Sequence, residues 1–404
     1  MRRHPGRVLM LAMVLALAAC NSTTSGTETT VPGASTVAPP PSTTLATPTS
    51  ETSTVPIAPF PTTAFAAISE DPVTETAAAD FQTALEEMAG GGGMSATVMT
   101  ADGTWSGAAG KADGVHDMQP DSQFGIGSGT KPIIAAQVMR LVEAGEISLD
   151  APATDYLPAD FTFDTNGATI RQLLSHRSGI PDFYDDAWME RMAEERSRVW
   201  KVDELLALVD AARRPLESFA YADTNYILLG LVIEHVGKRP LVDVLRDGVL
   251  RVEGTERLIY QPDEAPTDPL AMPGGESRTA LEQGGGYLPS IADTSSDGPA
   301  GAMASDSLSL ARWWRALCAG EILSEASLTE MSTFYDNADI DYGLGLMNPA
   351  DEYAQGVGHM GANFGYNSWS ACLTDDHLIV VVLTNFDASI FELGRPLVVA
   401  ARSE

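Results

Sequence analysis

The sequence predicts an α+β domain in which one antiparallel sheet is built from both ends of the chain. Segments 94–100 and 105–111 flank the turn Ala101-Asp102-Gly103-Thr104, an arrangement that is typical of a β-hairpin. Residues 366–373 and 378–385, near the C-terminus, are again strand-like. Strands at both ends with helical patterns between them indicate a sheet flanked by helices and an inserted, mainly helical subdomain over roughly residues 115–335.

Residues 1–20 are expected to be a targeting segment. Arg2, Arg3 and Arg7 form a basic start, and the apolar run that follows is too short for a comfortable membrane span. The run ends in Leu17-Ala18-Ala19-Cys20, which resembles the lipobox of bacterial lipoproteins. The resemblance implies cleavage before Cys20, lipidation of that cysteine and anchoring at the cell membrane. An ordinary signal peptide with a chance cysteine is the alternative.

Residues 21–66 have the composition of a tether, because they consist mostly of Thr, Ser, Pro and Ala and cannot bury a core. The folded domain is expected over residues 67–404. Its helices are expected at 71–88, 170–174, 202–212, 226–236, 308–317 and 389–402, and a further strand at 342–347. Residues 253–300 are rich in Gly, Pro and Asp and are expected to form long loops.

Composition narrows the classes of partner. The 24 basic and 55 acidic residues give a net charge of -31, which repels nucleic acid and anionic lipid headgroups alike. The three cysteines are too scattered for a zinc site, and the six histidines form no pair at helical spacing, so no metal is expected. The glycine-rich runs have no Lys-Ser/Thr after them, and no cofactor is expected. Cys318 and Cys372 are left as either a disulfide or two buried thiols.

The stretch Phe124-Gly125-Ile126-Gly127-Ser128-Gly129-Thr130-Lys131 carries the strongest chemical signal. Ser128 and Lys131 are three residues apart at the start of an amphipathic helix, so both lie on one face of its first turn. The positive end of the helix dipole favours a serine alkoxide and a neutral lysine. The alternative is a serine N-cap followed by an exposed lysine.

Three further stretches complete a pattern. They are Thr169-Ile170-Arg171-Gln172-Leu173-Leu174-Ser175-His176-Arg177-Ser178-Gly179, Phe219-Ala220-Tyr221-Ala222-Asp223-Thr224-Asn225, and Gly358-His359-Met360-Gly361-Ala362-Asn363. Together with the Ser128 stretch, in this order and spacing, they resemble the serine β-lactamase family, in its class C β-lactamase, D-alanyl-D-alanine carboxypeptidase and esterase branch. The resemblance covers about residue 75 to the C-terminus and implies the β-lactamase/transpeptidase-like fold.

The resemblance implies a role for each residue. Ser128 attacks a carbonyl and forms an acyl-enzyme, Lys131 or Tyr221 takes its proton, and His359 stands where many relatives carry a lysine. Gly361 lets the substrate lie against an edge strand, and the N–H groups of Ser128 and Ala362 form an oxyanion hole. His176 is expected to order a turn. Esters, D-alanyl peptides and β-lactams all fit this chemistry.

Asp223 departs from the family pattern, in which an asparagine amide contacts the substrate at this position. An ionised carboxylate cannot donate that hydrogen bond, so the sequence predicts a preference for simple esters over β-lactams and D-alanyl peptides. A nearby cation that paired with Asp223 would remove this reason.

Two other functions compete with an acyl-enzyme of this family. An α/β-hydrolase triad of Ser128, Asp223 and His359 needs a Gly-x-Ser-x-Gly elbow, and Ile126 and Thr130 occupy the glycine positions. A non-catalytic envelope protein that keeps the fold as a binding module or sensor is the second alternative.

Overall fold

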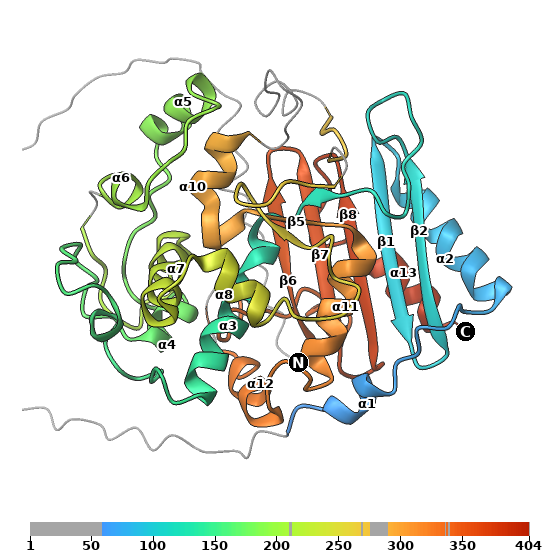
Figure 1. Ribbon diagram of the computed structural model, residues 1–404. Helices are drawn as coiled ribbons and strands as arrows, with labels where there is room; N and C mark the ends of the chain where they lie inside the picture. Colours follow the sequence, from blue (N-terminus) through green and yellow to red (C-terminus); the bar gives the residue numbers. More distant parts are fainter. Residues whose placement is uncertain are drawn as a thin grey trace, which may run out of the picture. The chain divides into compact units, whose positions relative to one another are not determined.

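The computed structural model describes residues 59–209, 212–267, 270–274, 290–335, 337 and 340–403 (Figure 1). The predicted targeting segment with Cys20, and the tether as far as residue 58, lie outside the described residues. Residues 59–66, which the sequence assigned to the tether, belong to the folded part, because helix α1 (Thr62–Ala66) buries Phe65 completely.

The main sheet confirms the predicted architecture. Its strands have the order β2-β1-β8-β7-β6, and neighbouring strands are antiparallel. The N- and C-terminal parts of the domain meet where β1 pairs with β8, with Met94 opposite Thr384. β8 is buried along its whole length, as expected for an apolar run in the middle of a sheet covered on both faces. The five strands are β1 (Gly93–Thr100), β2 (Gly103–Gly110), β6 (Gly356–Asn363), β7 (Tyr366–Leu373) and β8 (Leu378–Thr384).

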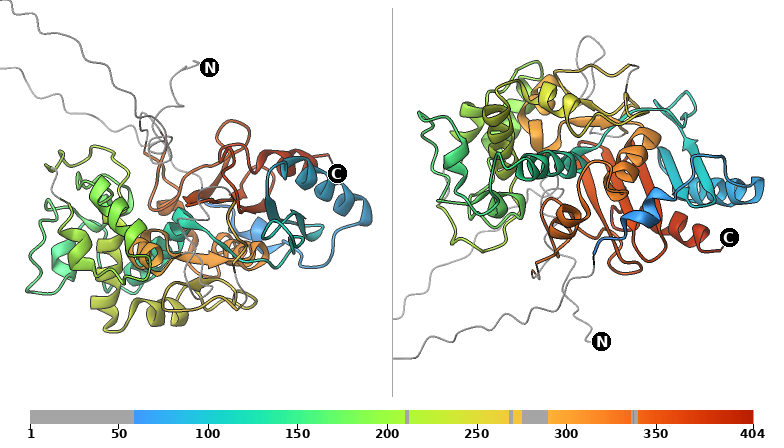
Figure 2. Two further views of the ribbon diagram at one scale, coloured as in Figure 1. Left: turned by 90° about the horizontal axis from the view of Figure 1, so that it is seen from above. Right: turned by 60° about the horizontal axis from the view of Figure 1, so that its bottom comes forward.

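Helices cover the sheet on both sides (Figure 2). α2 (Glu75–Met88) packs on β2 and on α13 (Arg395–Ala401), whereas α11 (Ser307–Cys318) packs on β1, β7 and β8. Trp369 on β7 contacts Gly394 just before α13. Cys372, three residues later, points to the other face and forms a disulfide with Cys318 of α11, which decides the question that the sequence left open.

The remaining helices form the inserted subdomain beside β6, to the left in Figure 1. A second, unpredicted sheet of order β3-β5-β4 lies in this part of the chain. The elements are β3 (Phe124–Gly125), the 3-10 turn η2 (Gly127–Thr130), α3 (Lys131–Glu143), the 3-10 turn η3 (Ala153–Tyr156), α4 (Ile170–Leu174), α5 (Asp186–Glu194), α6 (Val202–Leu206), α7 (Thr224–Gly237), α8 (Leu241–Asp247), β4 (Ile259–Tyr260), α10 (Ile291–Gly301), β5 (Met303–Ser305) and α12 (Glu325–Met331).

Several predicted boundaries were wrong for local reasons. α2 begins at Glu75 rather than 71, because Pro72 disfavours helix and the side chain of Thr74 caps the first turn by accepting from the N–H of Ala77. Residues 342–347 form no strand. Tyr342 pairs with Met347 across a tight loop in which Gly345 has φ +77°. α6 and the C-terminal helix are shorter than predicted.

The predicted loop over residues 253–300 was the largest error. It contains β4 and all but the last residue of α10, a helix capped by the side chain of Ser290, which accepts from the N–H of Asp293. The helix was not predicted because glycine and proline within it are typical of loops. α10 breaks at Gly298 (φ +43°), a conformation that glycine adopts at little steric cost, and continues through Pro299 to Gly301.

Candidate active site

Ser128 lies on η2, which packs against the edge strand β6. Gly127 has φ +51°, and a Cβ there would lie 2.8 Å from the carbonyl oxygen of Ala362. Gly361 permits the same approach from the strand, because its Cβ would lie 2.0 Å from the carbonyl oxygen of Ile126. The family resemblance implies that Gly361 makes room for substrate, and the structure shows that it makes room for the backbone of the Ser128 turn. Ser128 itself remains partly exposed.

Lys131 begins α3 and is completely buried. Its Nζ donates to Ser128 Oγ at 2.9 Å and to the carbonyl oxygen of Ala300 at 2.9 Å, and it forms an ion pair with Asp223 Oδ1 at 2.6 Å. Three oxygen atoms thus surround a group that carries three N–H donors when it is charged. The cation that pairs with Asp223 is therefore Lys131, and Asp223 is not an unpaired acceptor.

The ion pair overturns the expected neutral lysine. Burial by itself lowers the pKa of Lys131. The negative charge of Asp223, with a smaller contribution from Tyr221, outweighs burial and holds the pKa above its usual value. Lys131 is therefore charged at rest and donates a hydrogen bond to Ser128. It becomes a base only after it has passed a proton to a neighbour.

Tyr221 is next to both groups. Its ring centroid lies 4.9 Å from Lys131 Nζ, and its hydroxyl lies near the side chains of Lys131 and Ser128. Burial raises the pKa of Tyr221, and the charge of Asp223 adds to the rise, whereas the charge of Lys131 opposes it only in part, so the resting phenol keeps its proton. Tyr221 is thus placed to pass a proton between Ser128 and the surroundings.

His359 lies at the predicted position on β6, but its ring is fully buried and its nitrogens are occupied. Nδ1 donates to the carbonyl oxygen of Met360 at 2.6 Å, so Nε2 accepts from the hydroxyl of Tyr342 at 2.9 Å. Burial, and after it the charge of Lys131, lowers the pKa of His359 to about 3. His359 is a neutral residue that supports the site. Neither of these hydrogen bonds joins His359 to Ser128 or Asp223, so the three residues do not form the triad of an α/β-hydrolase.

Ala362, the second expected oxyanion donor, is on β6, the strand that packs against η2. Gly358 exchanges both backbone bonds with Met347, on the side of β6 that faces away from β7. Because the direction of backbone groups alternates along a strand, the N–H of Ala362 points to this same free edge. Ser128 is in the first turn of η2, where N–H groups have no partner within the helix. The N–H groups of Ser128 and Ala362 are thus free of hydrogen bonds within η2 and within the β6–β7 ladder.

His176 is structural, as the sequence suggested, and it holds the tyrosine motif. Its ring stacks on Tyr221, with centroids 4.1 Å apart. Its Nδ1 accepts from the N–H of Ala222 at 3.2 Å and from the side chain of Asn225 at 3.2 Å. His176 therefore holds the ring of Tyr221 in place by stacking on it and by fixing the backbone of Ala222.

Sequence reasoning missed four residues around the carboxylate of Asp223 and the amide of Asn363. Asp182 and Tyr184 come from the loop after α4, and Asp293 and Asp297 come from α10. The one signal for them was the spacing of four between Asp293 and Asp297, which fits a helix face. That signal lay in a stretch whose composition predicted loops.

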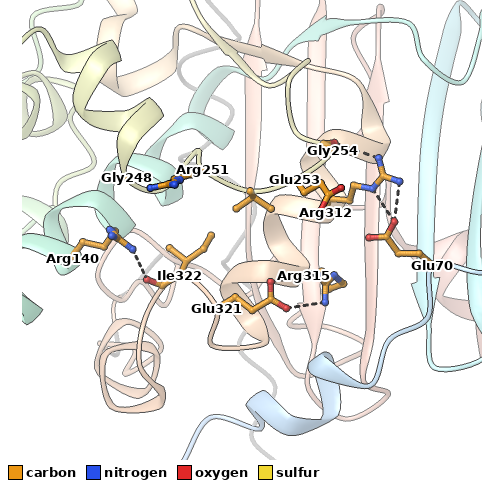
Figure 3. A pocket seen from close by; sticks show the side chains of 11 residues that line it. Glu70, Arg140, Gly248, Arg251, Glu253, Gly254, Arg312, Arg315, Glu321 and Ile322 are labelled. Atoms are coloured by element: carbon orange, nitrogen blue, oxygen red, sulfur yellow. Dashed lines mark hydrogen bonds and ion pairs between the residues drawn. The ribbon is translucent and has the colours of Figure 1, made fainter.

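The structure also has a large pocket away from Ser128 and Lys131. It has a volume of about 650 Å³ and is lined by Arg140, Arg251, Arg312 and Arg315 among other residues (Figure 3). Arg312 pairs with Glu70 and Arg315 with Glu321, so much of its charge is neutralised internally. None of the predicted catalytic residues lines it. The candidate site is therefore the Ser128 cluster.

A family model and several known proteins are similar to this chain. The Beta-lactamase family model matches residues 78–401. Protein flp of Staphylococcus aureus (strain MW2) is 29% identical over 136 residues, which are 33% of this chain and 27% of the relative. A penicillin-binding protein of Bacillus subtilis (strain 168) is 23% identical over 292 residues, 66% of this chain and 62% of the relative. The chain thus spans less than two thirds of the length of these curated relatives.

Solved structures extend the likeness to the whole fold. A D-stereospecific amidohydrolase from Streptomyces sp. has a TM-score of 0.65 and 26% identity, covering 79% of this chain and 98% of its own. The D-amino acid amidase from Ochrobactrum anthropi SV3, complexed with L-phenylalanine amide, has a TM-score of 0.69 and 25% identity, covering 81% and 99%.

Proposed function

The chain belongs to the beta-lactamase family of serine hydrolases, and from that premise we propose that it hydrolyses carboxylic esters or amides through an acyl-enzyme on Ser128. The observation that carries the proposal is the contact between Lys131 Nζ and Ser128 Oγ at 2.9 Å, with the Tyr221 ring centroid 4.9 Å from the same Nζ. D-alanyl peptides and β-lactams fall within this class of substrate, and two structural neighbours are named as amidohydrolases or amidases.

The proposed reaction uses the Lys131–Asp223 pair as a proton relay. Ser128 Oγ attacks the substrate carbonyl while its proton moves to Lys131 Nζ, and Lys131 releases one of its own protons to Asp223 Oδ1, 2.6 Å away. The N–H groups of Ser128 and Ala362 stabilise the oxyanion. The proton then returns through Lys131 and Tyr221 to the leaving group, and water attacks the acyl-enzyme by the reverse path.

The Lys131 pairing changes the expectation about esters. The predicted clash between an unpaired Asp223 and a substrate amide loses its basis, because the carboxylate already has a cationic partner. Asp223 no longer gives a reason to favour esters over amides or β-lactams, and the choice of substrate depends on other groups near the nucleophile.

Labelling of the serine tests the function directly. A fluorophosphonate probe should label the wild-type protein, and Ser128→Ala should abolish labelling and hydrolysis while the melting temperature changes little, because Ser128 is partly exposed. A wild-type protein that neither reacts with the probe nor turns over esters, nitrocefin or D-alanyl peptides would favour the alternative of a non-catalytic binding protein.

We also propose that the protein is a lipoprotein, anchored through Cys20 on the outer side of the cell membrane. The lipobox-like sequence supports this, and the Cys318–Cys372 disulfide fits an oxidising compartment. Among the helices that are described, none is long and apolar enough to cross a bilayer. Cys20→Ser should move the protein from the detergent phase to the aqueous phase or leave its precursor uncleaved. Unchanged partitioning and processing would refute the anchor.

A further inference from the structure

Four carboxyl groups form a cluster that begins at Lys131, and we call Asp182, Asp223, Asp293 and Asp297 the carboxyl cluster. The backbone N–H of Asp223 donates to Asp182 Oδ2 at 3.0 Å. The side-chain amide of Asn363 donates to Asp293 Oδ2 at 3.0 Å and to Asp297 Oδ2 at 3.1 Å. The hydroxyl of Tyr184 donates to Asp297 Oδ1 at 2.6 Å. Segments far apart in the sequence thus converge on one side of the nucleophile.

The cluster has more negative charge than the described residues around it neutralise. Lys131 pairs with Asp223, and it is the positive charge that acts on Asp182 and Asp297. Ionisation of the other three carboxyl groups leaves an excess of negative charge in a buried place, which is costly without a cation.

Asp293 supplies an independent sign of a missing partner. Its side chain is fully buried, and its Oδ2 shares the amide of Asn363 with Asp297 Oδ2, which keeps the two carboxyl groups side by side. Its Oδ1 has no hydrogen-bond partner among the described residues. A buried acceptor without a donor costs roughly 1–3 kcal/mol, and more when it is charged. A ligand that donates hydrogen bonds and carries positive charge would satisfy both the vacant acceptor and the excess charge.

The position of the cluster ties it to the substrate. Asp223 and Ser128 both contact Lys131 Nζ, so the cluster begins two polar contacts from the nucleophile. Asn363 directly follows Ala362, the proposed oxyanion donor. Asp223 and Asp297 are 8% and 6% exposed, and Asp182 is only partly buried, so the cluster has an edge that faces solvent. A cation bound to the cluster would therefore lie close to the carbonyl group that Ser128 attacks.

We propose that the carboxyl cluster binds an ammonium group on the acyl part of the substrate, so that the protein acts on amides or esters of amine-bearing carboxylic acids, such as amino-acid amides. The inference rests on the proposed function, because it concerns the substrate of the same acyl-enzyme. An ammonium group fits because it offers up to three N–H donors to carboxylate oxygens while it neutralises charge.

Binding of such a cation depends on pH. Burial, with a further contribution from Asp223, raises the pKa of Asp182 to about 7, and Lys131 and two backbone N–H groups oppose the rise. Burial raises the pKa of Asp297 to about 7 as well, with Asp223 adding to the rise and the Tyr184 hydroxyl and Lys131 opposing it. Burial and Asp297 raise the pKa of Asp293, and Asn363 opposes this. Below neutral pH the cluster gains protons, so its affinity for an ammonium group falls.

Protection of Ser128 from a fluorophosphonate probe tests the inference without requiring turnover. Alaninamide and isobutyramide have nearly the same shape, but an ammonium group in the first replaces a methyl group in the second. At pH 7 we expect one enantiomer of alaninamide to protect at a concentration at least about tenfold lower than isobutyramide, a difference of about 1.4 kcal/mol. The advantage should shrink as the pH is lowered to about 5.5.

Variants assign the effect to the cluster. Asp297→Asn keeps the shape of the side chain and should reduce the advantage of alaninamide at least about fivefold, while isobutyramide protects as before. Asp182→Asn is the second variant should Asp297→Asn fail to label. Asp247→Asn removes an acidic charge from an exposed side chain on α8 and should leave the ratio unchanged.

Each outcome has one meaning. Equal protection by the two amides in the wild type, or an advantage that survives both cluster variants, would overturn the inference while the serine still reacts with the probe. Failure of the wild-type protein to react with the probe at all would count against the proposed function instead.

Discussion

Asp223 holds Lys131 in its charged form and, in the proposed relay, also accepts its proton. Asp223→Asn removes the acceptor, so kcat/KM at pH 7 should fall about tenfold or more for every substrate. The same change removes the charge that raises the pKa of Lys131, so that pKa should fall and the variant should regain activity as the pH rises. The measurement is a pH profile of kcat/KM for the wild type and the variant.

The opposite result has an equally clear meaning. If Lys131 acts alone as the base, a lower pKa leaves more neutral lysine at pH 7, and Asp223→Asn becomes faster than the wild type. That outcome would disprove the relay and leave Ser128 and Lys131 in their roles.

His176 offers a second test at the scale of one side chain. His176→Phe keeps a ring against Tyr221 but removes the Nδ1 acceptor of the Ala222 N–H and the Asn225 side chain. We expect kcat to fall about tenfold with little change in KM, because Tyr221 loses its orientation rather than a substrate contact. His176→Asn restores an acceptor near the Nδ1 position and should recover part of the loss. A lower melting temperature with unchanged kcat in the phenylalanine variant would show that His176 serves stability alone.

At the scale of elements, the disulfide joins a helix to the sheet that it covers. Cys318 of α11 and Cys372 of β7 are separated by 54 residues, and closing a loop of that length stabilises the fold by about 4 kcal/mol in the chain-entropy model. The Cys318→Ala/Cys372→Ala protein should therefore unfold at a lower temperature in calorimetry, while the probe still labels Ser128 at 25 °C. An unchanged melting temperature, with and without reductant, would mean that the bond does not form.

Elements with a strong local pattern were predictable, and elements that depend on distant partners were not. The hairpin β1–β2 and helices α3, α7 and α11 follow from periodicity and turn residues in a short window. α10 was missed because Gly298 and Pro299 suggest a loop, and only its packed position makes a broken helix stable. The short strands β3, β4 and β5 owe their form to each other, and no single one of them has a strand-length pattern.

The same distinction holds for the site. Ser128 and Lys131 lie three residues apart on one turn, so their contact could be foreseen. The Lys131–Asp223 ion pair and the carboxyl cluster join residues far apart in the chain, and such contacts cannot be predicted from the spacing of residues in the sequence. The neutral lysine was predicted from the helix dipole alone, whereas the nearby carboxylate has a larger effect on its pKa.

The whole molecule combines a net charge of -31 with a buried group of acids at its candidate active site. Self-repulsion among surface acids and the cost of ionising the carboxyl cluster act in the same direction as the pH rises. Stability towards unfolding is therefore expected to depend on pH through these two contributions together, and the buried one can be separated by mutation.

The last prediction follows from the sign of the pKa shifts. Asp182 and Asp297 have pKa values of about 7 in the fold, well above the ordinary value of 3.8, so between those limits the folded state binds more protons than the unfolded state. Stability from these groups is present at acidic pH and is lost as the pH rises through 7. Burial lowers the pKa of His176 and of His359. Below about pH 6.5 these two histidines therefore oppose any further gain in the free energy of unfolding.

The melting temperature should therefore rise by about 2 °C from pH 8 to pH 6.5 and level off below. Asn at position 297 imitates the protonated acid at every pH, so Asp297→Asn should melt above the wild type at pH 8, and the difference should shrink at pH 6. Differential scanning calorimetry at these values measures both effects, and Asp247→Asn on the surface is the matched control. A constant difference across the pH range would mean that Asp297 is not the group that titrates, and a melting temperature that falls from pH 8 to pH 6.5 would contradict the raised pKa values of the carboxyl cluster as a whole.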